Sequence, residues 1–229
     1  MLAISTHTKY AAFAFVPTKQ VFSHALAIVS SDEFGVLGTL CSSVYESWAF
    51  EYGSSLGHTL RYTPSDCFET FPFSTPDLSD LSIQFPTLNT IGETYYTHRQ
   101  AVMRDRQEGL TKTYNRFHDA NERASDIQKL RELHVEMDQA VAAAYGWQDL
   151  DLGHGFHQTK QGIRFTISET ARREVLDRLL ELNHQRYAEE VAQGLHDKKK
   201  AKGKGQKAKL AASSKLSKST MGRCPCCKA

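Results

Sequence analysis

A proline-interrupted stretch between residues 72 and 92 divides this sequence into two parts of different character. Proline removes a backbone donor and disfavours helical conformation in the residue before it, so such a stretch, rich also in Ser and Thr, is typical of a linker. Its prolines are Pro72, Pro76 and Pro86. We therefore predict a linker over 76–91, between a first part over 1–75 and a second part over 92–196.

The first part has the composition of short strands. Lys9–Val16 and Val21–Val29 are rich in β-branched and aromatic residues on either side of a turn at 17–19, and predict a hairpin. Thr59–Thr63 predicts a further short strand.

One helix is expected within this first part. Ser30 and Glu33 have the spacing of a capping box, and Gly53 is a suitable stop. The apolar residues between them recur at helical spacing, namely Leu37, Cys41, Val44 and Trp48.

The second part is mainly helical. Helices are expected over Glu93–Glu108, from a Ser125 cap to Tyr145, and from Ser168 to Gly194, with a small hairpin over Phe156–Ile167 that turns at 160–162. Their predicted inward residues are Ile127, Leu130, Leu133, Met137, Val141 and Tyr145, and then Val175, Leu179, Leu182 and Tyr187. The predicted fold class is α+β, a partial β-rich module followed by a mainly helical domain.

Charge separates the last 33 residues from the rest. Residues 197–229 hold 11 of the 28 Lys and Arg residues and one of the 26 acidic residues, a formal charge of +10, which leaves −8 on residues 1–196. This Lys-rich tail has too little apolar surface to offset the entropy of ordering, so we expect it to be disordered. It can serve as a non-specific phosphate-binding arm or as a solvated tail.

Neither a secretory signal nor an apolar run long enough to span a membrane is present, which favours a cytoplasmic protein with reduced thiols. Cys224, Cys226 and Cys227 crowd the end of the chain but lack the fourth ligand of a structural zinc site. His154 and His157, in a Gly-rich turn, and His134 are also too few for a predicted metal site. We expect no metal.

Catalytic motifs are absent from the sequence. No Gly-rich loop follows a strand and opens a helix, no Asn/Asp-Pro-Pro-aromatic tetrapeptide occurs, and HExxH and GxSxG are both missing. We predict no catalytic residue and no cofactor-binding residue, and hence not an enzyme that works on its own.

DNA-contacting residues are the alternative kind of site. The first 75 residues hold three cations, Lys9, Lys19 and Arg61, against six acidic residues, so few positions can face a phosphate backbone. Arg61 follows a Gly-containing turn and carries a guanidinium that can donate twice to phosphate or guanine. We predict Arg61, Tyr62, Lys9 and Lys19 as DNA-binding, with Tyr62 equally open to a place in the core.

Several blocks resemble one known family. They are Trp48 and Gly53 with Leu60–Thr63 and Phe68–Phe73, then Gly109–Asp119, Leu130–His134 with Met137 and Asp138, Ala144–Trp147, Arg164–Ser168 and Leu182–Glu190. Together they resemble, in order and over about residues 10–196, the closing part of the target-recognition domain and the C-terminal helical domain of MmeI-like fused type II restriction–methyltransferase proteins.

The resemblance implies a protein that recognises DNA within a system that methylates adenine from S-adenosylmethionine and often cleaves DNA. The catalytic domains of that family lie upstream and have no counterpart here, so the resemblance implies a recognition fragment with DNA as partner, and also a separately encoded methyltransferase or nuclease chain. The alternative is a helical remnant whose basic tail binds nucleic acid without specificity.

Overall fold

The first strand is the centre of a three-stranded antiparallel sheet in the computed structural model, which describes residues 1–57 and 59–195. Strand β1 (Leu2–Ser5) pairs with β3 (Ala14–Phe15) on one side and β4 (Leu26–Val29) on the other. The expected hairpin between 9–16 and 21–29 is therefore wrong. Leu2 and Ile4 are almost fully buried, so this apolar strand takes the central position and separates the two predicted partners.

A second three-stranded sheet has the order β2 (His7–Thr8), β6 (Thr59–Arg61) and β5 (Ser54–Leu56). The pairing of β2 with β6 continues through a hydrogen bond from the Tyr62 amide to the Thr6 carbonyl at 2.8 Å. Strand β6 confirms the predicted strand after residue 58, although it is shorter than expected. Helix α3 (Pro64–Cys67) follows it.

The predicted helix between residues 30 and 53 is broken into α1 (Phe34–Cys41) and α2 (Ser43–Tyr52). The break is at Ser42, whose backbone is extended and whose Oγ accepts a hydrogen bond from the Tyr45 amide. Glu33 precedes α1 without a side-chain capping bond, so the expected capping box is not formed. The four apolar residues predicted for this helix are all buried, and Gly53 ends α2 as expected.

The segment expected as a linker is folded. It contains the 3-10 helix η1 (Leu78–Asp80), α4 (Leu81–Gln84) and the first turn of α5 (Pro86–Arg106). Proline at the first helical position loses no hydrogen bond, which explains why α5 begins at Pro86 and not near residue 93. Helix α1 lies directly on α5, since a Cβ atom at Gly92 would collide with the carbonyl oxygen of Phe34.

The elements after α5 are α6 (Leu110–Phe117), α7 (Ser125–Ala144), the hairpin β7 (Gly155–Thr159) with β8 (Gly162–Thr166), and α8 (Glu169–Ala192). Helix α6 was not predicted, and the others follow in the predicted order. Ser125 is the first residue of α7 and not its cap, which is Ala124. The Ser168 hydroxyl accepts the Ala171 amide and caps α8 as predicted. Tyr187, expected to point inward, is 57% exposed.

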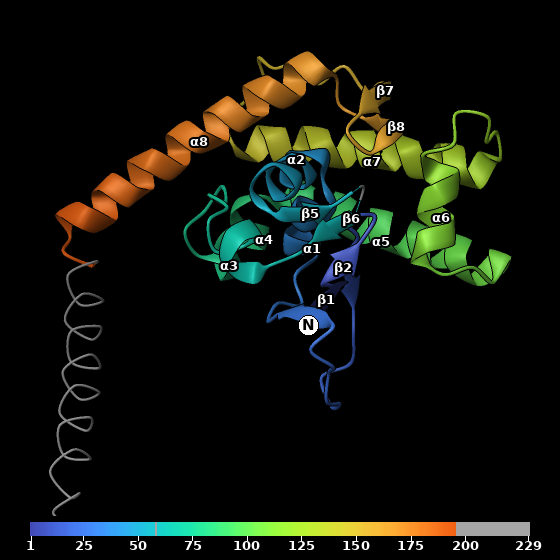
Figure 1. Cartoon of the computed structure of the whole chain (residues 1–229), viewed down its shortest axis with the longest axis horizontal. Coiled ribbons are helices and arrows are strands. Elements are labelled where there is room, and N and C mark those ends of the chain that lie inside the picture. The colour runs from blue at the N-terminus through green and yellow to red at the C-terminus, as the bar shows by residue number, and fades with distance from the viewer. Residues whose placement is uncertain (58, 196–229) are drawn as a thin grey trace, which may run out of the picture. The chain divides into compact units, whose positions relative to one another are not determined.

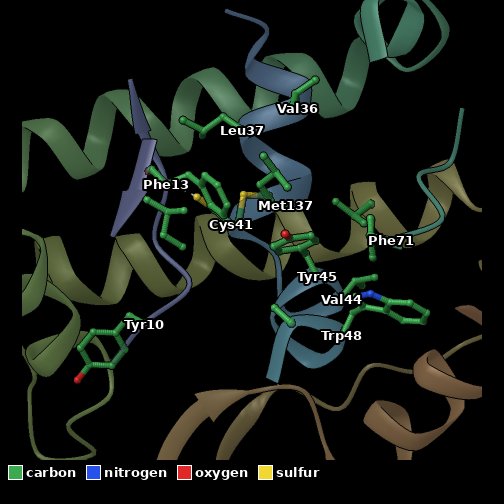
Figure 2. Packing of buried hydrophobic residues seen from close by; sticks show 14 of the residues in the cluster. Tyr10, Phe13, Val36, Leu37, Cys41, Val44, Tyr45, Trp48, Phe71 and Met137 are labelled. Atoms are coloured by element: carbon green, nitrogen blue, oxygen red, sulfur yellow. Dashed lines mark hydrogen bonds between the residues drawn. The ribbon is translucent and has the colours of Figure 1, made fainter. Parts of the chain in front are cut away.

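One hydrophobic core joins residues from both sides of the proline-rich stretch. Figure 2 shows Phe13, Cys41 and Tyr45 gathered near Met137 of α7. Residues 1–183 form one compact unit, and the described residues 184–195 lie outside it. The α+β class is confirmed (Figure 1). Because both parts share one core, they are not separate structural domains. That they have different functions, recognition in the first part and not in the second, stays a prediction.

No helix in the described part of the chain is long and apolar enough to cross a membrane. The predicted disordered tail over 197–229, with its three cysteines, lies outside the described residues.

Candidate nucleic-acid interface

Arg61 lies in an exposed polar row across the second sheet. The register of the sheet places Arg61 opposite His7 on one side and opposite Ser54 on the other. All three residues are exposed. Paired residues on neighbouring strands point to the same face, so His7, Arg61 and Ser54 present their side chains together. A guanidinium held on a short strand in this way can meet a phosphate or a base edge.

Lys9 follows β2 directly and is held by α6. Its ammonium donates to Asn115 Oδ1 at 3.0 Å, and the Tyr10 hydroxyl donates to the same oxygen at 2.6 Å. Lys112 is exposed on α6, three residues before Asn115 and hence on the same face of that helix. Among the described residues, neither Arg61 nor Lys112 forms a salt bridge.

We call His7, Lys9, Arg61 and Lys112 the basic patch. The structure thus brings two of the predicted cations, Lys9 and Arg61, to the second sheet and its flank. Lys19 is exposed in the loop between β3 and β4, and no contact links it to the basic patch. Sequence reasoning missed His7 and Lys112, because strand pairing and the presence of α6 were needed to find them.

Tyr62 belongs to the core, which corrects its predicted place at the interface. Its side chain is 2% exposed, and its hydroxyl lies 2.6 Å from the hydroxyl of Tyr45. The ring of Phe13 meets it edge to face. Successive residues of a strand point to opposite faces, so an exposed Arg61 leaves the next residue buried.

A buried polar network links α2, α7 and the loop before β7. Asp138 is fully buried; it accepts the Ser43 amide at 2.8 Å and lies 2.8 Å from His154 Nε2. His134 Nε2 lies 3.1 Å from Ser43 Oγ and 3.6 Å from Asp138. Burial favours the neutral carboxyl, but the two histidines and Ser43 outweigh it and hold the pKa of Asp138 below its usual range.

The network does not have the geometry of a nucleophilic triad. In such a triad the histidine uses one ring nitrogen for the serine and the other for the carboxylate. Here the same nitrogen of His134 faces both Ser43 and Asp138, and its Nδ1 has no partner among the described residues. We read the network as a structural connection. His134 and Asp138, four residues apart on one helix, are the sequence signal that could have indicated it.

The histidines considered for a metal are held by different groups. His154 meets Asp138, whereas His157 Nε2 lies 2.8 Å from the carbonyl oxygen of Gly153. Within residues 1–57 and 59–195, no group of three or more His, Cys, Asp or Glu side chains is placed to hold a metal ion.

Comparison with known proteins gives a structural relative. No protein-family model matches the chain, and no curated protein matches its sequence. In structure the chain is similar to MmeI, a type IIL restriction-modification enzyme solved in complex with DNA, with a TM-score of 0.56 and 18% sequence identity. The match covers 82% of this chain and 21% of the MmeI chain, so the chain spans about a fifth of that enzyme. At this identity the likeness shows a shared fold.

Proposed function

We propose that this chain carries a DNA-recognition part of a restriction-modification protein and contacts DNA through the basic patch. The observation that carries the proposal is the shared fold with MmeI over 82% of the chain, since that enzyme was solved with DNA. The resemblance of the sequence blocks between residues 10 and 196 to the same class of protein supports it independently. Recognition of DNA is the role that this part of the family is expected to have.

The charge distribution of the chain is consistent with DNA recognition through a small contact surface. The formal charge of residues 1–196 is −8, so a long-range attraction of the body to DNA is not available. A contact with DNA must then use the few places where cations are exposed and unpaired. Arg61 and Lys112 satisfy that requirement, and Lys9 is held in position by an uncharged partner, Asn115.

The test is DNA binding by fluorescence anisotropy, with selection from a random duplex library, for the wild type and for Arg61→Ala. If Arg61 reads a base, the variant loses about 1–3 kcal/mol of affinity on the selected sequence and little on others. Arg104→Ala is the matched control, because Arg104 is an exposed arginine of α5 outside the basic patch. Equal binding by wild type and Arg61→Ala on every duplex would contradict the proposal for this residue.

The second candidate is a helical remnant that binds nucleic acid only through its Lys-rich tail. The +10 charge of residues 197–229 favours it. Removal of residues 197–229 distinguishes the two, because tail binding has a steep salt dependence from the release of many counterions. The recognition proposal expects sequence preference to persist after the truncation. Loss of all binding together with its salt dependence favours the remnant.

Catalysis and the S-adenosylmethionine cofactor are assigned by this proposal to other parts of the system, within a longer protein or on a partner chain. The absence of a Gly-rich loop and of the Asn/Asp-Pro-Pro-aromatic tetrapeptide from the 229 residues supports that assignment. We expect no transfer of tritiated methyl groups to DNA by this chain alone. Methylation by the purified chain would contradict it.

A further inference from the structure

We propose that the cavity between α2, the β7–β8 hairpin and the first turn of α8 binds a phosphate-like oxyanion against the guanidinium of Arg164. All of its lining residues belong to the compact unit 1–183. The cavity has a volume of about 50 Å³, whereas one water requires roughly 10–15 Å³ measured in this way. It therefore has room for a group the size of phosphate or sulfate.

Arg164 is the reason to expect an anion. It lines the cavity from β8, its side chain is buried to 93%, and its Nη2 has no hydrogen-bond partner among the described residues. A buried guanidinium nitrogen without an acceptor is costly. The guanidinium carbon of Arg164 lies 4.6 Å from the centre of the Tyr10 ring, and a ring cannot replace an oxygen acceptor for Nη2.

Glu46 lines the same cavity from α2 but forms no salt bridge with Arg164, since no nitrogen–oxygen pair of the two lies within 4.0 Å. An acid and a base that line one cavity without a direct salt bridge can be bridged by a group that enters it. When Glu46 is protonated, its hydroxyl offers a donor to an oxyanion in the cavity. The bridged group would then be held between two donors.

The other charged residues of the cavity are more exposed. Lys160 lies 3.5 Å and Arg172 lies 4.0 Å from the same oxygen of Glu51, and Arg172 also pairs with Glu169. With Glu46 neutral, the lining residues carry three positive charges and one negative charge. The balance around the cavity then favours an anion.

The protonation of Glu46 gives the site a measurable signature. Burial and the nearby Asp138 raise the pKa of Glu46 to about 7, against the opposing effects of Arg164 and of the Ala11 amide. A bound oxyanion adds negative charge and raises this pKa further, so binding takes up a proton above pH 7. Sulfate is a suitable probe, because it does not titrate in this range and any pH dependence belongs to the protein.

The experiment is calorimetric titration of the full chain with sodium sulfate against sodium chloride of equal ionic strength, from pH 6 to pH 8.5. We expect saturable binding of sulfate whose affinity falls by up to about tenfold per pH unit above pH 7. Glu46→Gln mimics the protonated acid and should bind sulfate as tightly at pH 8 as at pH 6. Glu51→Gln is the matched control and should retain the pH dependence.

Arg164→Gln should abolish sulfate binding. Should that variant fail to fold by circular dichroism, the Glu46→Gln comparison still decides. Absence of saturable binding to the wild type, or an unchanged pH dependence in Glu46→Gln, overturns the proposal.

The oxyanion can be a free phosphate ester or a backbone phosphate of DNA. Competition between sulfate and a short duplex separates these sources, since a DNA phosphate in the cavity makes the two mutually exclusive. If sulfate and DNA do not compete, the cavity is a site for a free phosphate ester. This outcome is possible whether or not the DNA-recognition proposal holds. The two proposals can therefore fail separately.

Discussion

The guanidinium of Arg99 on α5 donates a hydrogen bond of 2.6 Å to the carbonyl oxygen of Phe13, 86 residues earlier in the chain. The same side chain, fully buried, donates to the Tyr114 hydroxyl on α6 at 3.0 Å. Arg99 thus connects the N-terminal segment, the long helix α5 and α6 in one place. Burial raises the pKa of Tyr114, which keeps this partner neutral.

Arg99→Met should destabilise the protein. The substitution keeps the apolar stem but leaves the Phe13 carbonyl and the Tyr114 hydroxyl without their donor. A hydrogen bond to a charged group contributes about 1.5–3 kcal/mol, and relief of the buried charge offsets part of this. We expect a loss of about 2–3 kcal/mol in urea unfolding. Arg104→Met, at an exposed position of the same helix, is the control and should change stability little.

Ser42→Ala should weaken the start of α2. The Ser42 hydroxyl accepts the Tyr45 amide at 3.2 Å and donates to the Thr39 carbonyl at 2.7 Å, so it joins the end of α1 to the start of α2. Loss of an N-cap serine costs about 1 kcal/mol. Chemical denaturation measures it, with the exposed Ser65→Ala as the control. A variant as stable as wild type would mean that Ser42 does not hold the break.

The broken helix also shows what the sequence could and could not predict. Helical spacing identified Leu37, Cys41, Val44 and Trp48 as buried, and they are. The same spacing runs through Ser42 without interruption, because periodicity depends on side chains and the break depends on a backbone angle. Local propensity predicts which residues are apolar and inward, while the position of a kink depends on tertiary partners.

The pairing of the strands and the composition of the candidate site could not be predicted from the sequence for a related reason. The two strands expected to pair with each other both pair with β1, a choice that depends on long-range contacts. The basic patch unites His7, Arg61 and Lys112 from three distant segments. The cavity at Arg164 likewise requires α2 and β8 to meet. Arg61 was predicted because cations are scarce in its segment, which is a property of composition and needs no fold.

The stability of the protein should depend on pH through His118. Burial, with Arg164 and other cations nearby, holds its pKa well below the usual value. Its Nδ1 accepts the Phe165 amide at 3.2 Å, a bond that protonation of Nδ1 would break. The unfolded chain therefore binds a proton near pH 6.5 that the folded chain does not, and falling pH favours unfolding by up to about 1.4 kcal/mol per pH unit.

His118→Asn keeps an acceptor but cannot become charged in this range. Below pH 6.5, the stability of the wild type relative to this variant should decline, as followed by urea unfolding at successive pH values. His24→Asn, at an exposed loop position, should show no such relative change. Parallel pH profiles for wild type and His118→Asn would exclude His118 as the source.

Glu46→Gln should stabilise the protein at high pH. The folded-state pKa of about 7 lies above that of an exposed glutamate, so the folded chain holds a proton between about pH 4.5 and pH 7 that the unfolded chain has lost. Above pH 7 the folded state carries a charge at a half-buried position, where it is less well solvated than in the unfolded chain. We expect a gain of about 2 kcal/mol at pH 8 and almost none at pH 5. A gain that is equal at both values would contradict the shifted pKa.

Tyr62→Phe should lower stability and leave DNA binding unchanged, although its neighbour Arg61 is the residue proposed to meet DNA. The two hydroxyls of Tyr62 and Tyr45 are partners at 2.6 Å in the core, and burial raises the pKa of both, so the bond is between neutral groups.

Removal of the Tyr62 hydroxyl leaves the one on Tyr45 buried without this partner, which costs about 1–3 kcal/mol. The double variant Tyr45→Phe/Tyr62→Phe removes both groups and should recover part of that loss, a coupling that a double-mutant cycle measures. Affinity for DNA, measured where the variant is folded, should equal that of wild type. A selective loss of DNA affinity in Tyr62→Phe would show that the tyrosine leaves the core to contact DNA. Tyr62 would then belong to the DNA interface, as first predicted.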